Sequence, residues 1–169
     1  MAPGDLDPVP EEPQENADSY AENAAAKARA YALATGLVTI ADDSGLEVYA
    51  LRGAPGVRSH RFFGEDASAA ERNSRLLAML EGVTDRSARF VCVTALASPD
   101  GHVELFDGEV HGEIAQAPRG RGGFGYDPVF IIAGDGRTMA ELPAAEKHRV
   151  SHRGLAGAKL RARLAAGAA

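Results

Sequence analysis

The sequence lacks the features that mark secreted, membrane-spanning and nucleic-acid-binding proteins. Its 169 residues include one cysteine, Cys92, so no disulfide framework can form and a reduced interior is expected. No apolar run reaches the length of a transmembrane helix, and the first residues lack the basic-then-apolar pattern of a signal peptide. The net charge of −6 disfavours nucleic acid and anionic membranes as partners, since binding to either needs an excess of Lys and Arg. We therefore expect a cytoplasmic protein.

Motifs of several catalytic and binding classes are also absent. There is no serine-hydrolase elbow, and Cys92 sits in an apolar strand pattern without an electropositive setting, so nucleophilic catalysis is not supported. The glycine-rich segment lacks the Gly-Lys-Ser/Thr ending of a P-loop and the strand–turn–helix context of a dinucleotide-binding fingerprint. No spacing of His and Cys indicates zinc. A nucleotide stays compatible with an acidic chain, because a metal ion and a few local cations can bind its phosphates.

The length and composition predict one folded domain after a short lead-in. Hydrophobic residues make up 45% of the chain and charged residues 25%, which is ordinary for a globular protein with one core. Residues 1–18 contain prolines and acids but few large apolar side chains, so we expect an extended or mobile lead-in there. A single domain is expected over residues 19–169.

Helix and strand patterns alternate along that domain. Ser19 predicts the N-cap of a helix that Gly36 ends, and Asp66 predicts the cap of a second helix over 67–80. The strongest strand pattern covers 90–97, which is apolar on both faces as in the centre of a sheet. The other expected elements are strands at 37–41, 46–50, 102–106, 109–115 and 129–132, and a last helix capped by Ser151. Together they predict an α/β (α+β) fold with one elongated mixed sheet flanked by helices.

Two adjacent carboxylates, Asp42 and Asp43, stand in the segment Ala41–Gly45, which we expect to form a turn after the strand at 37–41. Buried, unpaired carboxylates are costly, so they shift their pKa or share a cation. Mg²⁺ is a suitable cation, because it takes oxygen ligands and keeps coordination positions for water and phosphate. An Asx-turn, in which either Asp caps backbone amides, explains the segment equally well.

Glu22 is a candidate metal ligand with a strong structural alternative. Ser19 and Glu22 have the spacing of a capping box, which explains the glutamate without any catalytic role. The helix that Glu22 opens leads directly into the strand that bears Asp42 and Asp43. The structural explanation is therefore favoured when Glu22 is considered alone.

The glycine-rich segment 119–128 is a candidate ligand loop. Its glycines allow the backbone to approach a ligand closely. Phe124 lies between two glycines, so its ring either inserts into the core or offers a face on which a planar base can stack. Asp127 precedes a proline, which confines it to an extended conformation from which it can hydrogen-bond a ligand. A ligand loop is favoured over an ordinary connection.

Several cations gather at 146–154, at the start of the last predicted helix. The helix dipole disfavours cations there unless an anion is bound, which indicates phosphate recognition. Lys147 would act as a point charge and Arg153 as a planar fork for oxygen atoms. A solvated basic face is the alternative. His148 and His152 are four residues apart, but Ser151 as an N-cap would break the helix needed to align them on a metal.

Several of these segments together resemble the inosine triphosphate pyrophosphatase family. The resemblance runs from about Ser19 to the C-terminus in the family's order, and its motifs are highly specific. They are Ser19–Ala24 with Lys27–Arg29, Ala41–Gly45, Gly53–Val57, Gly122–Pro128, and Glu146–Lys147 with Ser151–Gly154. The resemblance implies hydrolysis of non-canonical purine nucleoside triphosphates (ITP, dITP, XTP) to the monophosphate and pyrophosphate. It also implies a homodimer whose subunits have two lobes around a central cleft.

The resemblance also assigns site residues. It implies that Glu22 and Asp43 hold Mg²⁺, that Asp43 is the general base and that Asp42 supports the metal site. It implies that Ser44 contacts the substrate and that Lys147 meets its phosphate. It implies that Phe124 stacks on the base and that His152 and Arg153 contact the base. The residues that would shape the base pocket are Gly125, Tyr126 and Asp127. Such a site would let a metal neutralise phosphate charge while a carboxylate activates water.

One part of the family pattern is not found in the sequence. Family members begin with a strand and a Ser/Thr-x-Asn-x-x-Lys loop that grips the triphosphate, and we find no such unit here. Two explanations follow: a start site assigned too late, which we favour, or a shortened variant. The main functional hypothesis is the Mg²⁺-dependent pyrophosphatase. The alternatives are a catalytically impaired nucleotide-binding or interaction protein and a different metal-dependent phosphohydrolase.

Overall fold

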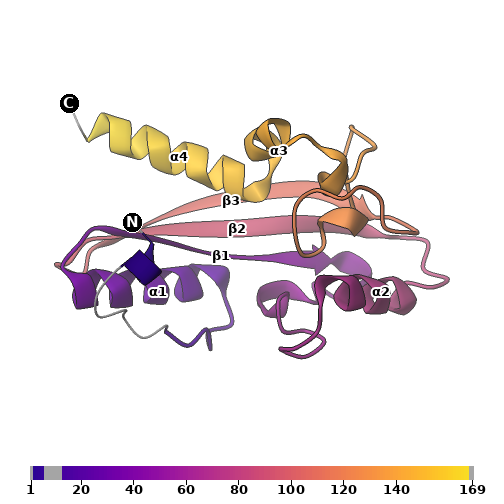
Figure 1. Ribbon diagram of the computed structural model, residues 1–169, viewed down its shortest axis with the longest axis horizontal. Helices are drawn as coiled ribbons and strands as arrows, with labels where there is room; N and C mark the ends of the chain where they lie inside the picture. The colour runs from indigo at the N-terminus through magenta and orange to yellow at the C-terminus, as the bar shows by residue number, and fades with distance from the viewer. Residues whose placement is uncertain (1, 6–12, 168–169) are drawn as a thin grey trace.

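The computed structural model describes residues 2–5 and 13–167, and its core is a long four-stranded sheet with helices on both faces (Figure 1). The strands follow one another in the order β1-β2-β3-β4, and each pair of neighbours is antiparallel. The elements are α1 (Tyr20–Thr35), β1 (Thr39–Val48), α2 (Ala69–Met79), β2 (Ser87–Ala97), β3 (Val103–Ile114), β4 (Phe130–Ile132), α3 (Ala144–Val150) and α4 (His152–Ala166). The predicted α/β class is confirmed, although all strand pairs in the described residues are antiparallel and the expected sheet was mixed.

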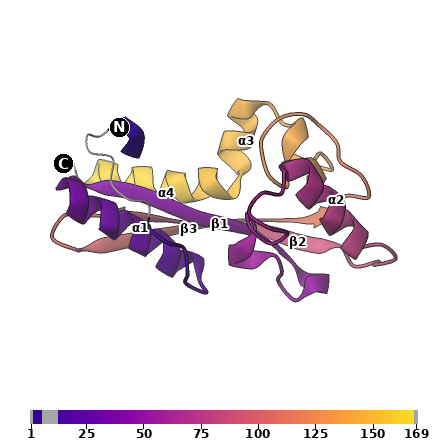
Figure 2. The same cartoon turned by 60° about the horizontal axis from the view of Figure 1, so that its bottom comes forward.

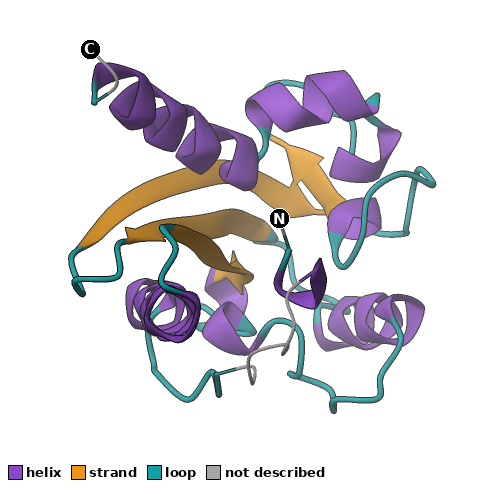
Figure 3. Cartoon of the chain, turned by 60° about the vertical axis from the view of Figure 1, so that its left-hand side comes forward, coloured by secondary structure: helices purple, strands orange, loops and turns teal. Residues whose placement is uncertain are grey.

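Helices α1 and α4 lie on opposite faces of the sheet, as Figure 3 shows. The alanines Ala24, Ala28 and Ala32 form the buried stripe of α1 and pack against Ala95 and Ala97 of β2. Because these side chains are small, the helix can approach the sheet closely. This small cluster forms the core at one end of the sheet.

A larger core lies at the other end of the sheet. Leu76 and Leu80, at the end of α2, are fully buried with Leu46 and Phe90 of the sheet. Strand β4 extends the sheet beside β3, and its first residue, Phe130, is buried in this core. The sheet therefore joins two core regions, which matches the expected two-lobed shape.

Two of the three predicted helix N-caps are confirmed. Ser19 caps α1 by accepting a hydrogen bond from the backbone N–H of Glu22 (3.2 Å), and Gly36 ends the helix with a left-handed φ of 69°. Ser151 caps α4 in the same way, through the N–H of Gly154 (3.1 Å). The cap of α2 is Ser68, in a capping box with Glu71, and Asp66 was the wrong prediction.

The strand predictions are corrected in two places. The acidic segment is no turn, because β1 continues through it and each of its residues from Thr39 to Val48 pairs with β2. Likewise, the two strands expected at 102–106 and 109–115 are one strand, β3, paired along its whole length with β2. The predicted central strand is confirmed as β2, which hydrogen-bonds β1 on one side and β3 on the other.

The lead-in is described only in part. Pro3–Asp5 forms a short 3₁₀ turn, residues 6–12 lie outside the described residues, and residues 13–17 have no regular structure. Its division from a domain at 19–169 stays a prediction. Within the described residues, none of the helices has the length and apolar character needed to cross a membrane.

Candidate functional site

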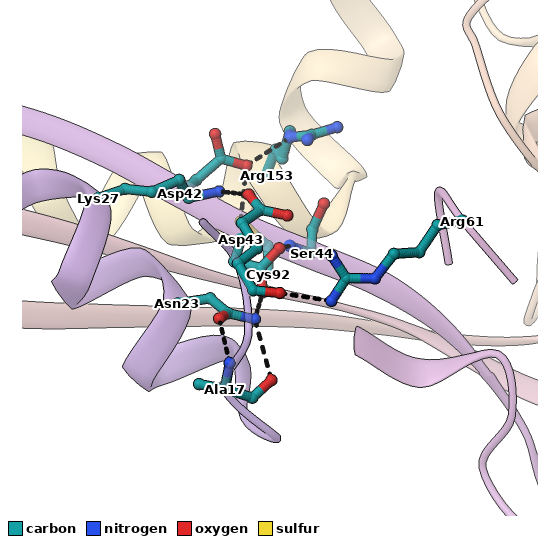
Figure 4. A network of polar contacts seen from close by, with 10 residues as sticks. Ala17, Asn23, Lys27, Asp42, Asp43, Ser44, Arg61, Cys92 and Arg153 are labelled. Carbon is teal, nitrogen blue, oxygen red and sulfur yellow. Dashed lines mark hydrogen bonds and ion pairs between the residues drawn. The ribbon is translucent and has the colours of Figure 1, made fainter. Parts of the chain in front are cut away.

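Asp42 and Asp43 point to opposite faces of the sheet, because successive side chains alternate along a strand. Asp43 Oδ2 accepts a hydrogen bond from Asn23 Nδ2 of α1 (2.9 Å). Asp42 Oδ2 accepts one from Arg153 Nε of α4 (2.8 Å), on the other face (Figure 4). The two carboxylates therefore do not converge on one cation, which corrects the expectation that Asp42 and Asp43 share a metal.

Asp43 is the buried carboxylate of this site, with 7% of its surface exposed. Its Oδ1 accepts a hydrogen bond from the Ser44 N–H (3.0 Å), and its other oxygen is held by Asn23. Burial raises the pKa of Asp43, while Asn23 and the nearby charge of Lys27 oppose that rise. A carboxylate with a raised pKa, fixed by two donors, is suited to accept a proton or to take part in cation binding.

Glu22 shares no hydrogen bond with Asp43 in the described residues. Its carboxylate accepts a hydrogen bond from the Ser19 hydroxyl (2.9 Å), so Glu22 is engaged at the start of α1, although not in the complete capping box that was predicted. The acid whose charge acts on Asp43 is Glu15 of the lead-in, which also raises the pKa of Asp43. Glu15 forms an ion pair with Lys27, one turn of α1 after Asn23.

Sequence reasoning thus missed four residues around Asp43: Glu15, Asn23, Lys27 and Arg61. Arg61 reaches the segment from the loop after β1 and donates a hydrogen bond to the backbone carbonyl of Glu15. The spacing of Asn23 and Lys27, four residues apart on α1, was a usable signal, because it places both side chains on one helix face. Glu15 gave no such signal, since its segment looked like part of a mobile lead-in.

The residues on the α1 side fit a hard cation in donor chemistry. Within the described part of the chain no three acidic, His or Cys side chains gather closely enough to hold a metal by themselves. Asp43 and Glu15 nevertheless supply carboxylate oxygens in one neighbourhood, and the charge of Lys27 acts on both. Mg²⁺ typically takes one or two carboxylates and completes its shell with water and phosphate.

The exposed ring of Phe124 forms the centre of the site on the α4 side. It is 62% exposed, so the alternative in which it inserts into the core is wrong. Lys147 Nζ lies 4.7 Å and Arg153 Cζ 4.9 Å from the ring centroid. Arg153 is in turn oriented by Asp42, as described above. The ring is therefore largely open to solvent and has two cations close to it.

The loop that carries Phe124 is fixed by Asp127. This carboxylate is 2% exposed, accepts a hydrogen bond from the Phe124 N–H (2.6 Å) and forms an ion pair with Lys147. Gly123 makes the turn possible: it has φ of 74°, and a Cβ there would lie 2.0 Å from Asp127 Oδ2. Gly125 is held from outside the loop, because its carbonyl accepts a hydrogen bond from Asn73 Nδ2 of α2 (3.1 Å).

A pocket of about 130 Å³ opens beside this loop. Tyr126 forms part of its wall, with its hydroxyl donating to the Ser59 carbonyl (3.0 Å). His152 forms another part, stacked on Phe90 with 4.6 Å between the ring centroids. Burial lowers the pKa of His152 to about 3, so the ring is neutral, and its buried Nδ1 has no hydrogen-bond partner among the described residues. The predicted residue Ser44 also lines this pocket, with Phe124, Gly125, Asp127 and Arg153.

The helix-dipole argument for Lys147 is corrected. The structure has a short extra helix, α3, and Lys147, His148 and Arg149 lie in its last turn, where the dipole favours cations. Ser151 ends α3 and caps α4, so His148 and His152 belong to different helices, as predicted. The case for an anion near Lys147 therefore depends on its position beside Phe124 instead.

The fold and these two sets of residues define an α/β protein with a site suited to a planar group that carries negative charge. The sequence pattern of the Ham1 family matches residues 2–163, and the chain belongs to the Ham1 family. This result agrees with the resemblance found in the sequence motifs.

Individual relatives support the same assignment. The chain is 53% identical over 150 residues to the dITP/XTP pyrophosphatase of Deinococcus deserti, covering 89% of this chain and 72% of the relative. It is 51% identical over 152 residues to the dITP/XTP pyrophosphatase of Syntrophobacter fumaroxidans, covering 90% of this chain and 65% of that protein. The chain thus spans about two thirds to three quarters of the length of these relatives.

The fold is shared with solved structures. The Ham1 protein of Staphylococcus aureus superposes with a TM-score of 0.90 at 42% identity, covering 97% of this chain and 85% of that structure. A HAM1 protein of Coxiella burnetii gives a TM-score of 0.87 at 45% identity, covering 92% and 81%.

Proposed function

We propose that the protein hydrolyses non-canonical purine nucleoside triphosphates, such as ITP, dITP and XTP, to the monophosphate and pyrophosphate. The observation that carries the proposal is the exposed ring of Phe124 close to Lys147 and Arg153, beside a mainly apolar pocket. A purine can stack on such a ring, and base–aromatic stacking contributes about 1–3 kcal/mol per base. The names of the relatives supply the substrate class.

The position of β1 at the edge of the sheet suggests how one substrate meets both faces. Asp43 belongs to β1 and contacts Asn23 of α1 on one face of the sheet. Arg153 belongs to α4 on the other face and contacts β1 through Asp42. A base bound near Phe124 and Arg153 with its phosphates passing over the strand edge would bring the triphosphate to Asp43. Arg153 would contact the base from the position that Asp42 fixes, and Lys147 would face phosphate. Asp42 is then a positioning residue.

In this mechanism Asp43 accepts a proton from the water that attacks the α-phosphorus. The water oxygen forms the new bond to phosphorus, the bridging α–β oxygen leaves with pyrophosphate, and the nucleoside monophosphate remains. Asn23 and the Ser44 N–H hold the Asp43 carboxylate, and burial gives it the basicity that this step needs. A divalent cation, Mg²⁺ by its preference for oxygen ligands, would be held by Asp43 with Glu15 and would neutralise phosphate charge.

The test measures pyrophosphate release from ITP, dITP, XTP and GTP, with Mg²⁺ and with EDTA. Activity on ITP, dITP or XTP that requires a divalent cation and disappears in Asp43→Asn is the expected result. Asp107→Asn is the matched control, because Asp107 is also a strand carboxylate but pairs with exposed Lys159 away from the site. Binding of ITP without turnover would instead identify an impaired nucleotide-binding protein, and preference for phosphate monoesters a different phosphohydrolase.

A second pair of variants compares the two glutamates. Glu15→Gln is expected to raise the Mg²⁺ concentration needed for half-maximal activity, because it removes a carboxylate near Asp43. Glu22→Gln is expected to leave that concentration unchanged, since Glu22 is engaged with Ser19. The opposite result would restore Glu22 as the metal ligand. We further propose a homodimer in the cytoplasm, which the single buried cysteine and the family resemblance support.

A further inference from the structure

Arg72 of α2 is a buried cation at the wall of the pocket beside Phe124. It is 8% exposed, and none of the sequence motifs discussed above includes it. Its Nη1 donates hydrogen bonds to the backbone carbonyls of His60 (3.0 Å) and Ala67. Its Nε and Nη2 groups make no hydrogen bond among the described residues, and neither is a fully buried atom, so both keep some accessible surface. Part of the guanidinium is therefore available to a ligand in the pocket.

The charge of Arg72 is also unbalanced. The other cations of the site are paired with acids: Lys147 with Asp127, and Arg153 with Asp42. For Arg72 no ion pair is formed within the part of the chain that the structure describes. A buried charge without a partner is costly, and a ligand that brings an acceptor or a negative charge offsets that cost.

The neighbouring acid does not fill this role. Glu71 accepts hydrogen bonds from the Ser68 N–H (2.8 Å) and hydroxyl (2.7 Å), in the capping box at the start of α2. These bonds turn the Glu71 carboxylate toward the helix end. The charge of Arg72 acts on Glu71 without an ion pair between them, so among the described residues Arg72 stays a pocket cation with no directly paired acid.

Purine bases differ in how well they match such a cation. Xanthine carries a second carbonyl at C2, and its N3–H loses a proton near neutral pH. A fraction of the xanthine bases is therefore anionic. Hypoxanthine lacks that carbonyl and stays neutral. We infer that Arg72 is a specificity-determining residue that favours a xanthine base over hypoxanthine in the proposed nucleotide site. The inference depends on the proposed base pocket, but it does not require turnover.

The test measures the dissociation constants of xanthosine and inosine 5′-monophosphates by calorimetry at neutral pH. The wild-type protein is expected to bind the xanthosine nucleotide more tightly, and Arg72→Gln to reduce the ratio of the two affinities about tenfold, as for loss of a hydrogen bond to a charged group. Arg72→Lys, which keeps the charge without the planar fork, is expected to retain part of the preference. A ratio of affinities does not depend on the fraction of folded protein.

Arg75→Gln is the matched control. Arg75 lies on the same helix and likewise donates from Nη1 to a loop carbonyl, that of Phe63 (3.1 Å), but it does not line the pocket. The Arg75→Gln variant should show the same ratio of xanthosine to inosine nucleotide affinities as the wild type. An equal preference in Arg72→Gln would overturn the inference and leave Arg72 as a link between α2 and the loop at 60–67. Binding with the expected shift but without pyrophosphate release would support Arg72 while contradicting the proposed hydrolysis.

Discussion

His152 links the chemistry of the site to the acid stability of the protein. Its ring is 5% exposed and stacked on Phe90, and burial lowers its pKa to about 3 from 6.5. Between these values the unfolded chain takes up a proton that the folded protein does not. Stability is therefore lost as the pH falls below 6.5, by roughly 2 kcal/mol at pH 5 from this residue alone.

The variant His152→Phe tests whether His152 causes this loss of stability at acid pH. Phenylalanine keeps the stack on Phe90 and has no proton to gain, so the variant should lose less stability on acidification than the wild type. The free energy of unfolding is measured in urea near neutral pH and at about pH 5. His102→Phe is the control, because His102 is exposed. An identical acid loss in wild type and His152→Phe would contradict the prediction.

Phe124 gives the residue-scale prediction for substrate binding. Phe124→Ala should raise the KM for ITP, because base–aromatic stacking contributes about 1–3 kcal/mol, while the folded protein keeps its thermal stability. Stability should hold because the ring is mainly exposed and its loop is fixed by Asp127. Kinetics with ITP and a thermal melt provide the two measurements. An unchanged KM in a folded variant would remove Phe124 from the base site.

At the scale of elements, Arg86 connects the end of α2 to the end of β3. The buried guanidinium donates to three backbone carbonyls, those of Leu80 (2.7 Å), Ile114 (2.7 Å) and Ala115 (2.8 Å). Arg86→Met would remove the guanidinium donor from each of these carbonyls and should cost about 3–5 kcal/mol of stability. Urea unfolding measures the loss. Arg163→Met, which removes a surface pair with Glu104, should cost less than about 1 kcal/mol.

The strands show where local sequence patterns mislead. Asp, Ser and Gly at 42–45 have turn preferences, yet the continuous pairing with β2 keeps them in β1, because ladder contacts outweigh local propensity. Gly45 is needed for close approach rather than for a turn: a Cβ there would lie 2.2 Å from the Gly56 carbonyl oxygen. Gly108 of β3 has the same role beneath α4, 2.2 Å from the His152 carbonyl oxygen. Neither approach is visible in a sequence, since both partners are distant along the chain.

At the scale of the whole molecule, the α4 side of the site was easier to predict than the α1 side. The Phe124 loop and Arg153 belong to dense local motifs, and the structure brings them together. The partners of Asp43 were harder, because Glu15 is held by Lys27 and Arg61 from 12 and 46 residues away. The expected turn also hid the alternation that sends Asp42 and Asp43 to opposite faces.

The free edge of β1 is the other whole-molecule feature, and Figure 2 brings it to the front. Away from β2, the edge makes one bridge in the described residues, between Glu47 and Pro55. Val38 and Ile40, at the start of this strand, are 63% and 54% exposed, and the preceding Leu33 and Leu37 are exposed as well. Exposed strand edges with apolar neighbours promote association with other chains.

We therefore expect this protein to associate through the start of β1, with a mass that rises with concentration. The double variant Val38→Lys/Ile40→Lys should shift the protein toward the monomer, because a charged edge opposes strand pairing. Size-exclusion chromatography with light scattering measures the mass over a dilution series. Met79→Lys is the control, since Met79 is also an exposed apolar residue, on α2, and its replacement should leave the mass unchanged. If the lysine pair left an oligomer intact, the subunits would have to meet through another surface, and the β1 edge would be covered by something other than a second copy.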